Sequence, residues 1–326
     1  MRAIVFDQPG DESVLRLDDV PPPSLGPQDL RIRVRATAVN RADLMQRQGL
    51  YPPPPGASSI LGLECAGEVI EVGAQVTGWK PGDRAMALLA GGGYAEQAVV
   101  HHGSAMHVPE SFSDVEAGAF PEVFLTAFLN VFLIGDPPPG GAVLAHGGGS
   151  GVGTATISLC NEAAVRVIVT AGSEEKCRRC REHGADVAIN YREGDFVPAV
   201  RDATDGRGVN VVLDSIGGRY LAQNLAALAV GGKLAVIGLM GGTRAELDLA
   251  TLLMKRMHVV GSTLRARSIE EKAAIVDAFE SRFGTALRAG RLRPVVDRVL
   301  PLAEAGEAHR IVHSSVHFGK VVLQIA

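Results

Sequence analysis

A glycine-rich segment at residues 145–155 carries the residue types that bind a phosphate group. It follows the apolar run Ala142-Val143-Leu144 and leads into small, helix-compatible residues. A strand that turns sharply into a helix presents unpaired backbone N–H groups and the positive end of the helix dipole to an anion. Glycine is needed where a Cβ would keep phosphates away from the backbone. We therefore predict a phosphate site formed by Gly148, Ser150, Gly151, Val152 and Gly153.

The elements around this segment alternate between strand and helix patterns. We expect strands at 142–145, 166–171, 187–190, 209–215 and 233–238, and a sixth at 258–264. A long apolar helix over 113–134 precedes them, with Ser113 and Glu116 as a capping box. Such alternation is typical of a doubly wound α/β fold, a parallel sheet with helices on both faces. In that setting the glycine-rich turn becomes a dinucleotide site.

The first third and the end of the chain have a different pattern. Residues 30–36 and 67–73 alternate with the period of a strand, and the prolines at 52–55 indicate a stiff loop. A helix over 268–289 and strands at 295–300 and 320–325 close the chain. We predict a β-rich domain of residues 1–121 plus 267–326, interrupted by a dinucleotide-binding domain of residues 122–266.

Composition limits the class of protein. The 326 residues are 46% hydrophobic and carry a net charge of -4, which favours packed domains and gives no support for a nucleic-acid partner. No apolar stretch approaches the ~18 residues of a membrane span, and the N-terminus lacks the apolar core of a signal peptide. Four cysteines do not form a disulfide framework in a chain of this size. We expect a cytoplasmic protein.

The residues after the second strand of the alternation bear on cofactor choice. NAD enzymes place Asp or Glu about 20 residues past the loop, to hold the ribose 2′-OH. Here Thr170-Ala171-Gly172-Ser173 ends the strand, and spacing alone is ambiguous because Glu174 lies close to the expected position. The register favours the small residues, beside which Ser173 and Lys176 could donate to a 2′-phosphate. This reading favours NADPH.

Several motifs occur in one order along nearly the whole chain: Asn40–Gly49, Pro53–Ser58, Ile60–Glu64, Pro121–Glu122, Leu125–Phe128, Ser150–Ala155, Thr170–Ser173, Gly238–Gly242 and Gly319–Leu323. With these motifs the chain resembles the zinc-free quinone oxidoreductase branch of the medium-chain dehydrogenase/reductase superfamily. The most similar branch is the tumour-suppressor-inducible, zeta-crystallin-like subfamily. The resemblance implies a six-stranded Rossmann domain inserted in a GroES-like catalytic domain, and a homodimer formed through the edge strand at 258–264.

The resemblance also assigns roles to residues. It implies that Ser173, Lys176 and Tyr191 grip the 2′-phosphate of NADPH, and that Tyr51 faces the substrate. A loop tyrosine packed on the prolines is an equally good reading of Tyr51. The residues that would seat the nicotinamide between the domains, or reach back towards the cofactor, are Asn40, Thr126, Gly238, Leu239, Leu264, Gly319 and Lys320.

Zinc enzymes of this superfamily have cysteine, histidine and cysteine where this chain has Asn40, Leu63 and Glu122. Leucine cannot bind zinc and the other two lack sulfur or imidazole donors, so we expect no metal site. Cys177 and Cys180 have a zinc-like spacing but lie in a predicted helix with no second pair. We also expect Asp43 and Glu64 to be structural and His146 to be a packed histidine.

These observations lead to one expected function and two alternatives. The expected function is NADPH-dependent, zinc-independent reduction of a quinone, with Asn40, Tyr51 and Thr126 at the reaction centre. The first alternative is an enone or enoyl reductase that uses the same hydride donor. The second is a dinucleotide-binding protein without catalysis, acting as a structural or RNA-binding protein.

Overall fold

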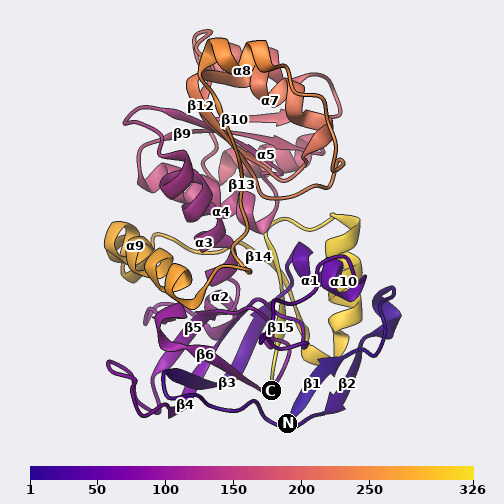
Figure 1. Ribbon diagram of the computed structural model, residues 1–326, viewed down its shortest axis with the longest axis vertical. Coiled ribbons are helices and arrows are strands. Elements are labelled where there is room, and N and C mark those ends of the chain that lie inside the picture. Colours follow the sequence, from indigo (N-terminus) through magenta and orange to yellow (C-terminus); the bar gives the residue numbers. More distant parts are fainter. The chain divides into compact units, whose positions relative to one another are not determined.

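The computed structural model describes residues 1–326, which form two compact units (Figure 1). One unit consists of Met1–Leu125 and Leu264–Ala326, and the other of Thr126–Thr263. We expected the boundaries at 121/122 and 266/267, and the chain passes between the units at 125/126 and 263/264. None of the helices combines the length and apolarity needed to cross a bilayer.

The second unit is built on a six-stranded parallel sheet, as predicted. Its strand order is β10-β9-β8-β11-β12-β13, and every neighbouring pair is parallel. The strands are β8 (Ala142–His146), β9 (Arg166–Ala171), β10 (Val187–Asn190), β11 (Val209–Asp214), β12 (Leu228–Val236) and β13 (His258–Gly261). Because parallel strands end at the same edge, the loops that follow β8, β9, β11 and β12 gather there.

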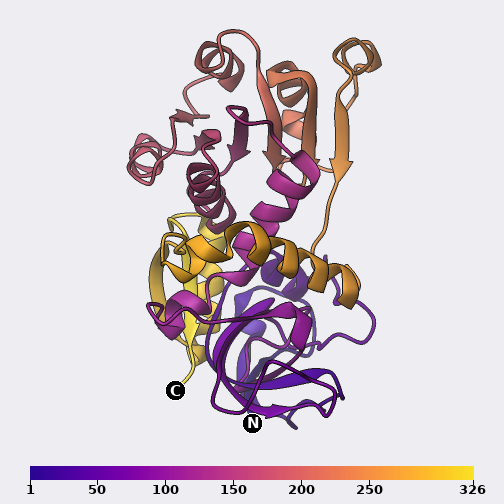
Figure 2. The ribbon, with the colours of Figure 1, turned by 90° about the vertical axis from the view of Figure 1, so that its left-hand side faces the viewer.

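Helices cover both faces of this sheet (Figure 2). They are α4 (Gly151–Glu162), α5 (Glu174–Glu182), α6 (Phe196–Ala203), α7 (Leu221–Ala227) and α8 (Leu249–Lys255). Ser150 and Ser173 are the N-caps of α4 and α5, and the side chain of each accepts the N–H of the residue three positions on. These caps are the local reason why both helices begin directly at the carboxyl edge of the sheet.

The first unit contains a seven-stranded sheet of order β14-β15-β3-β4-β5-β7, with β6 paired to β3. Its strands are β3 (Asp29–Ala38), β4 (Glu64–Val72), β5 (Arg84–Leu88), β6 (Gln97–His101), β7 (Ala105–His107), β14 (Val296–Pro301) and β15 (Lys320–Gln324). A separate ribbon pairs β1 (Arg2–Val5) with β2 (Arg16–Asp19). The helices are α1 (Arg41–Arg47), α2 (Asp114–Ala117), α9 (Ile269–Arg288) and α10 (Ala305–Ser314).

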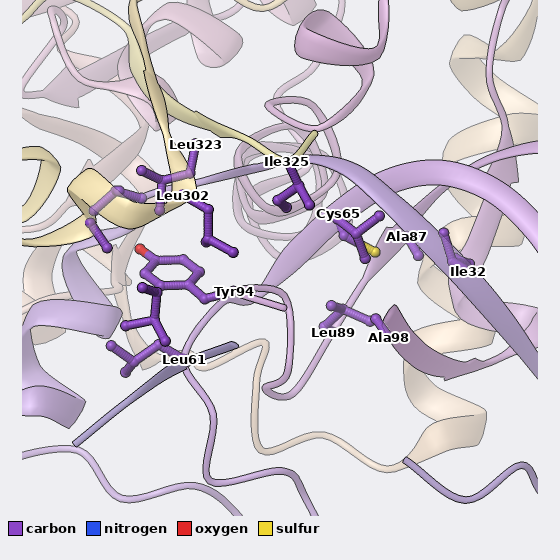
Figure 3. Close-up of a cluster of buried hydrophobic side chains, with 14 of the residues drawn as sticks. Ile32, Leu61, Cys65, Ala87, Leu89, Tyr94, Ala98, Leu302, Leu323 and Ile325 are labelled. Carbon is purple, nitrogen blue, oxygen red and sulfur yellow. The ribbon is translucent and has the colours of Figure 1, made fainter. Parts of the chain in front are cut away.

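The largest core of this unit lies between its sheet and α10. Figure 3 shows Leu61, Leu302 and Leu323 beside the ring of Tyr94, with Cys65 and Ile325 further along the same cluster. Tyr94 is fully buried, yet its hydroxyl oxygen is polar and must find partners inside the core. The partners are described below, because they reach the candidate site.

The predicted continuous helix over 113–134 is wrong. The capping box of Ser113 and Glu116 does begin α2, but a new helix, α3 (Pro121–Phe128), starts at Pro121 and continues as a π-helix over Leu129–Gly135. Gly118 packs against the backbone of Ala36, which turns the chain, and Pro121 offers no N–H to continue α2.

The predicted edge strand at 258–264 is also too long. The edge strand ends at Gly261 rather than 264, because its neighbour β12 ends at Val236, the residue opposite Gly261. Leu264 therefore lies beyond the sheet, where the chain enters the first unit.

Candidate functional site

The glycine-rich turn between β8 and α4 has the form of a phosphate cradle. Gly147 has a φ of +75°, and a Cβ on Gly153 would lie 2.3 Å from the Gly147 carbonyl oxygen. Only glycine lets the start of α4 approach the turn this closely. The chain thus requires glycines here for backbone packing, which also leaves the turn open to a ligand.

Ser150 is the N-cap of α4, and it stands where the dinucleotide-binding fingerprint Gly-x-Gly-x-x-Gly has its middle glycine. Its Oγ accepts the N–H of Gly153 at 3.0 Å. That bond leaves the first-turn amides of Gly151 and Val152 at the helix start, where the positive end of the dipole lies. The serine therefore shapes the anion site, and the residues present fit a pyrophosphate.

The ends of β9 and β10 bring Ser173 and Tyr191 together. Tyr191 donates its N–H to Ala171, and its hydroxyl lies 2.7 Å from where a Cβ on Gly172 would be. The Oγ of Ser173 accepts the N–H of Lys176 at 3.3 Å, so its own O–H proton is left to donate elsewhere. The three predicted 2′-phosphate residues lie at the same corner of the sheet edge.

Glu174 was the residue that made the spacing ambiguous. Its carboxylate pairs with the guanidinium of Arg181, further along the same helix. The carboxylate is thus directed along α5 rather than held at the strand end. This placement leaves Gly172 and Ser173 without a carboxylate held beside them at the end of β9.

The remaining predicted residues of the second unit are Gly238, Leu239 and Thr126. Gly238 and Leu239 follow β12 at the same sheet edge, and a Cβ on Gly238 would lie 2.9 Å from the carbonyl oxygen of Ser215 after β11. Thr126 lies in α3, and its carbonyl accepts the side-chain amide of Asn130 at 2.8 Å. Asn130 sits in the π-helix, a rare element that is frequent at functional sites.

In the first unit, the buried side chains of Glu64 and Lys320 form a polar trio with the half-buried Asn40. The ammonium of Lys320 donates to Asn40 Oδ1 at 2.7 Å and to the Val39 carbonyl at 3.2 Å, and it lies 2.8 Å from Glu64 Oε1. Asn40 donates its amide to Glu64 Oε1 at 2.9 Å and to the Ala38 carbonyl at 3.2 Å. Both Asn40 N–H groups are used, so its oxygen is the atom that can still accept a hydrogen bond.

Gly319 makes the approach of Lys320 feasible. It has a φ of +93°, and a Cβ on it would lie 2.2 Å from the Val295 carbonyl oxygen. We expected Gly319 and Lys320 to reach towards the cofactor. In the structure the Lys320 ammonium bonds to Asn40, Val39 and Glu64, all within its own unit.

A buried chain of hydrogen bonds holds Asp43, which caps α1 beside Asn40. Arg47 donates to His309 Nδ1 at 3.3 Å, so the ring proton is on Nε2 and is directed to the Tyr94 hydroxyl at 3.2 Å. Tyr94 then donates to Asp43 Oδ2 at 3.3 Å. Because arginine only donates, the chain runs in one direction and ends on the carboxylate.

Asp43 uses that carboxylate to fix the backbone around it. It accepts the N–H of Asn40 at 2.8 Å and the N–H of Gly62 at 3.1 Å. Burial raises the pKa of Asp43 to about 6, and burial lowers the pKa of His309 to about 3. Asp43 is thus the structural residue we expected, whereas sequence reasoning missed Tyr94 and His309, which are 215 positions apart.

Tyr51 begins the proline-rich loop and is half-buried. Burial raises the pKa of its phenol, so the phenol is neutral near pH 7 and can donate a hydrogen bond. Its carbonyl accepts from Arg265 at 3.3 Å. Arg265 was not singled out in the sequence, where only its place next to Leu264 could have drawn attention.

The other sequence candidates are packing residues. His146 is buried, bonded to Thr170 Oγ1 at 3.0 Å and Asn224 Oδ1 at 2.7 Å, and burial lowers its pKa to about 4. Cys177 and Cys180 are buried thiols of α5. No group of three or more His, Cys, Asp or Glu side chains is arranged to hold a metal ion.

Comparisons with known proteins agree with this architecture. Residues 26–110 match the model of the alcohol dehydrogenase GroES-like domain, and residues 151–281 match that of the zinc-binding dehydrogenase. Quinone oxidoreductase-like protein 2 of Bos taurus is 31% identical over 312 residues, which are 95% of this chain and 89% of the relative. The chain belongs to the medium-chain dehydrogenase/reductase superfamily.

The solved structures that this chain resembles include quinone oxidoreductases and a dehydrogenase. Escherichia coli quinone oxidoreductase, solved in complex with NADPH, superposes with a TM-score of 0.87 at 26% identity over 99% of this chain and 100% of that one. The structure of an NAD-dependent alcohol dehydrogenase has a TM-score of 0.86 at 34% identity and covers 100% of both chains. The chain is therefore an oxidoreductase with a dinucleotide-binding fold, and its cofactor and substrate must be argued from its own residues.

Proposed function

We propose that this protein reduces quinones with NADPH and without zinc. The observation that carries the proposal is the trio of Asn40 with the buried Glu64 and Lys320. In zinc members of the superfamily a cysteine ligand stands at the position of Asn40. Here the cation bonded to Asn40 is the ammonium of Lys320, which also neutralises Glu64.

Support for NADPH comes from the ends of β9 and β10. Ser173 has an O–H to donate, the Tyr191 hydroxyl lies over Gly172, and the nearest acidic residue, Glu174, pairs with Arg181. A 2′-phosphate would meet donors at this corner, whereas an NAD enzyme would present a carboxylate.

The chain's own residues bind and orient the reactants. The turn at Gly147–Gly153 would hold the pyrophosphate, and Asn40 Oδ1 would accept a hydrogen bond from a bound ligand. The neutral phenol of Tyr51 would donate to a quinone oxygen. Bound there, NADPH supplies the hydride, and with a proton from water the quinone becomes a hydroquinone.

The test is NADPH consumption with simple ortho- and para-quinones, measured before and after dialysis against a chelator. We expect turnover with both quinones and the same rate after dialysis. Turnover of an enone with none of any quinone would replace this proposal by the enone reductase. Tight NADPH binding without any turnover would favour a non-catalytic protein.

We also propose a homodimer formed through the β13 edge. β13 is the last strand of its sheet, and Val259 on it is exposed. The preceding helix α8 exposes Leu249, Leu253 and Met254, the last two by more than three-quarters of their area (76% and 77%). An unpaired strand beside exposed apolar side chains favours pairing with a second copy. Light scattering after size-exclusion chromatography is the check, and a monomer at working concentration would contradict the proposal.

A cytoplasmic location remains part of the proposal. All four cysteines are free and buried, which suits a reducing compartment. Fractionation of cells that express the tagged full-length chain would test it, and recovery outside the cytoplasmic fraction would contradict it.

A further inference from the structure

The loop of residues 51–59 cannot hold itself together through its backbone. Its prolines at 52–55 have no N–H to donate. Within the loop the structure has one backbone hydrogen bond, from Ala57 to Pro54 at 3.0 Å. The position of Tyr51 must therefore be set by donors outside the loop that bond to its carbonyl groups.

Arg265 supplies these donors at the start of the loop. Its NH1 donates to the carbonyl of Tyr51 at 3.3 Å, and its guanidinium carbon lies 5.3 Å from the centre of the Tyr51 ring. Its Nε donates at 2.8 Å to the carbonyl of Ala90, which follows β5 closely in the chain. One side chain thus contacts both the backbone and the ring of Tyr51.

Gln46 extends the same network to the far end of the loop. Arg265 NH2 donates to Gln46 Oε1 at 2.6 Å, and Gln46 Nε2 donates to the carbonyl of Ser59 at 2.8 Å. The two ends of the loop are therefore tied to one guanidinium, directly at Tyr51 and through Gln46 at Ser59.

The clamp is rigid. The Arg265 side chain is only 3% exposed, and Gln46 is 5% exposed. A planar guanidinium forks between acceptors in fixed directions, which an ammonium cannot do.

We propose that Arg265 is a positioning residue that sets the place of Tyr51 and thereby the fit of the substrate. The inference rests on the proposed quinone reduction and assigns its substrate selectivity to the clamp of Arg265 and Gln46. When the clamp is loosened, Tyr51 no longer lies where it donates to a small substrate. NADPH, which binds the other unit's glycine-rich turn, should be unaffected in its binding.

The test compares two conservative variants, Arg265→Lys and Arg293→Lys. Arg293 is a matched control in the same unit, because it donates to the carbonyls of Ser111 and Gly290 and to Glu116 and lies 5.0 Å from the ring of Phe112. None of these control residues belongs to the candidate site. Three quantities are measured for the full-length protein: KM and kcat for a one-ring para-quinone, Kd for NADPH, and hydrogen exchange of the amides at 56–59.

We expect Arg265→Lys to raise KM for the quinone about tenfold, which is the effect of roughly one lost interaction of a charged donor. The Kd for NADPH should change by less than about twofold, and the loop amides should exchange faster, since they lie between the two tied ends. Arg293→Lys should leave all three quantities as in the wild type.

An unchanged KM in Arg265→Lys would overturn the proposal, whether or not the amides exchange faster. Equal effects of the two lysine variants would also overturn it, since they would indicate a general loss of stability. If the wild type reduces no quinone, the proposed function fails. Hydrogen exchange then still decides whether Arg265 holds the loop.

Discussion

The Nζ atom of Lys320 lies 2.8 Å from Oε1 of Glu64, and the two side chains are 3% and 0% exposed. A buried ion pair of this kind is held by its geometry, because each partner leaves an uncompensated charge if the other is removed. The pair also binds both ends of the Asn40 amide. Stability and orientation of the site are therefore linked through these three residues.

Removal of one partner should be far more costly than removal of both. We expect Lys320→Met to lower the free energy of unfolding by about 3–5 kcal/mol, and the double variant with Glu64→Gln to recover part of this loss. Urea unfolding of the single and double variants measures the coupling. The exposed pair Arg33–Glu68 is the control, and Arg33→Gln should cost less than about 1 kcal/mol. Equal costs for Lys320→Met and Arg33→Gln would refute the buried coupling.

The hydroxyl of Tyr94 should matter beyond its place in the core. Tyr94→Phe leaves the His309 Nε2 proton and one Asp43 lone pair without partners, which should cost about 1–3 kcal/mol. Because Asp43 fixes the backbone of Asn40, quinone turnover should fall as well. Ile325→Val, in the same core, is the control for a loss of about 0.5–1.5 kcal/mol by packing alone. Wild-type turnover in both variants would show that the Tyr94 hydroxyl does not affect the site through Asp43.

Buried neutral histidines should make the protein sensitive to acid. The pKa of His146 is lowered by burial from 6.5 to about 4, so the unfolded chain binds a proton in this range that the folded chain does not. Stability from this group is present above pH 6.5 and is lost as the pH falls towards 4, by up to about 3 kcal/mol. His309 acts in the same direction, whereas Asp43, with its raised pKa, acts in the opposite one between 3.8 and about 6.

His146→Asn separates this effect from general destabilisation. Urea unfolding at several pH values between 7 and 4 should give a flatter dependence in the variant than in the wild type. Parallel curves, displaced by a constant amount, would show that His146 does not titrate on unfolding.

Cofactor preference can be reversed at the N-cap of α5. Ser173→Asp keeps an N-capping oxygen but adds a carboxylate where the 2′-phosphate is proposed to lie. We expect affinity for NADPH to fall at least about tenfold, while affinity for NADH is kept or improved. Ser268→Asp, at the N-cap of α9, is a matched control that should leave both affinities unchanged. Fluorescence titration with the two nucleotides measures the effect, and an equal loss for both would speak against a 2′-phosphate site.

Short sequence patterns predicted those parts of the fold whose structure depends on residues close together in the chain. The parallel sheet, the capping box at Ser113 and the turn at Gly147–Gly153 follow from patterns a few residues long. Ser150 could be recognised as a departure from the glycine fingerprint, but its role as an N-cap is visible only in the structure.

Contacts between distant segments could not be predicted in this way. Tyr94 meets His309 and Arg265 meets Gln46 only because strands and helices far apart in the chain pack together. The long helix over 113–134 was wrong for a related reason, since Gly118 packs against Ala36 and so bends the chain where local propensity favours a helix.

The central claim is most directly tested by one set of kcat/KM values on a chelator-treated preparation of the wild type. A para-quinone is assayed with NADPH and with NADH, and an enone is assayed with NADPH. The account predicts that quinone with NADPH is preferred over each of the other two combinations by at least about tenfold, a difference of ~1.4 kcal/mol in transition-state stabilisation. Preference for the enone, preference for NADH, or loss of quinone turnover on chelation would contradict it.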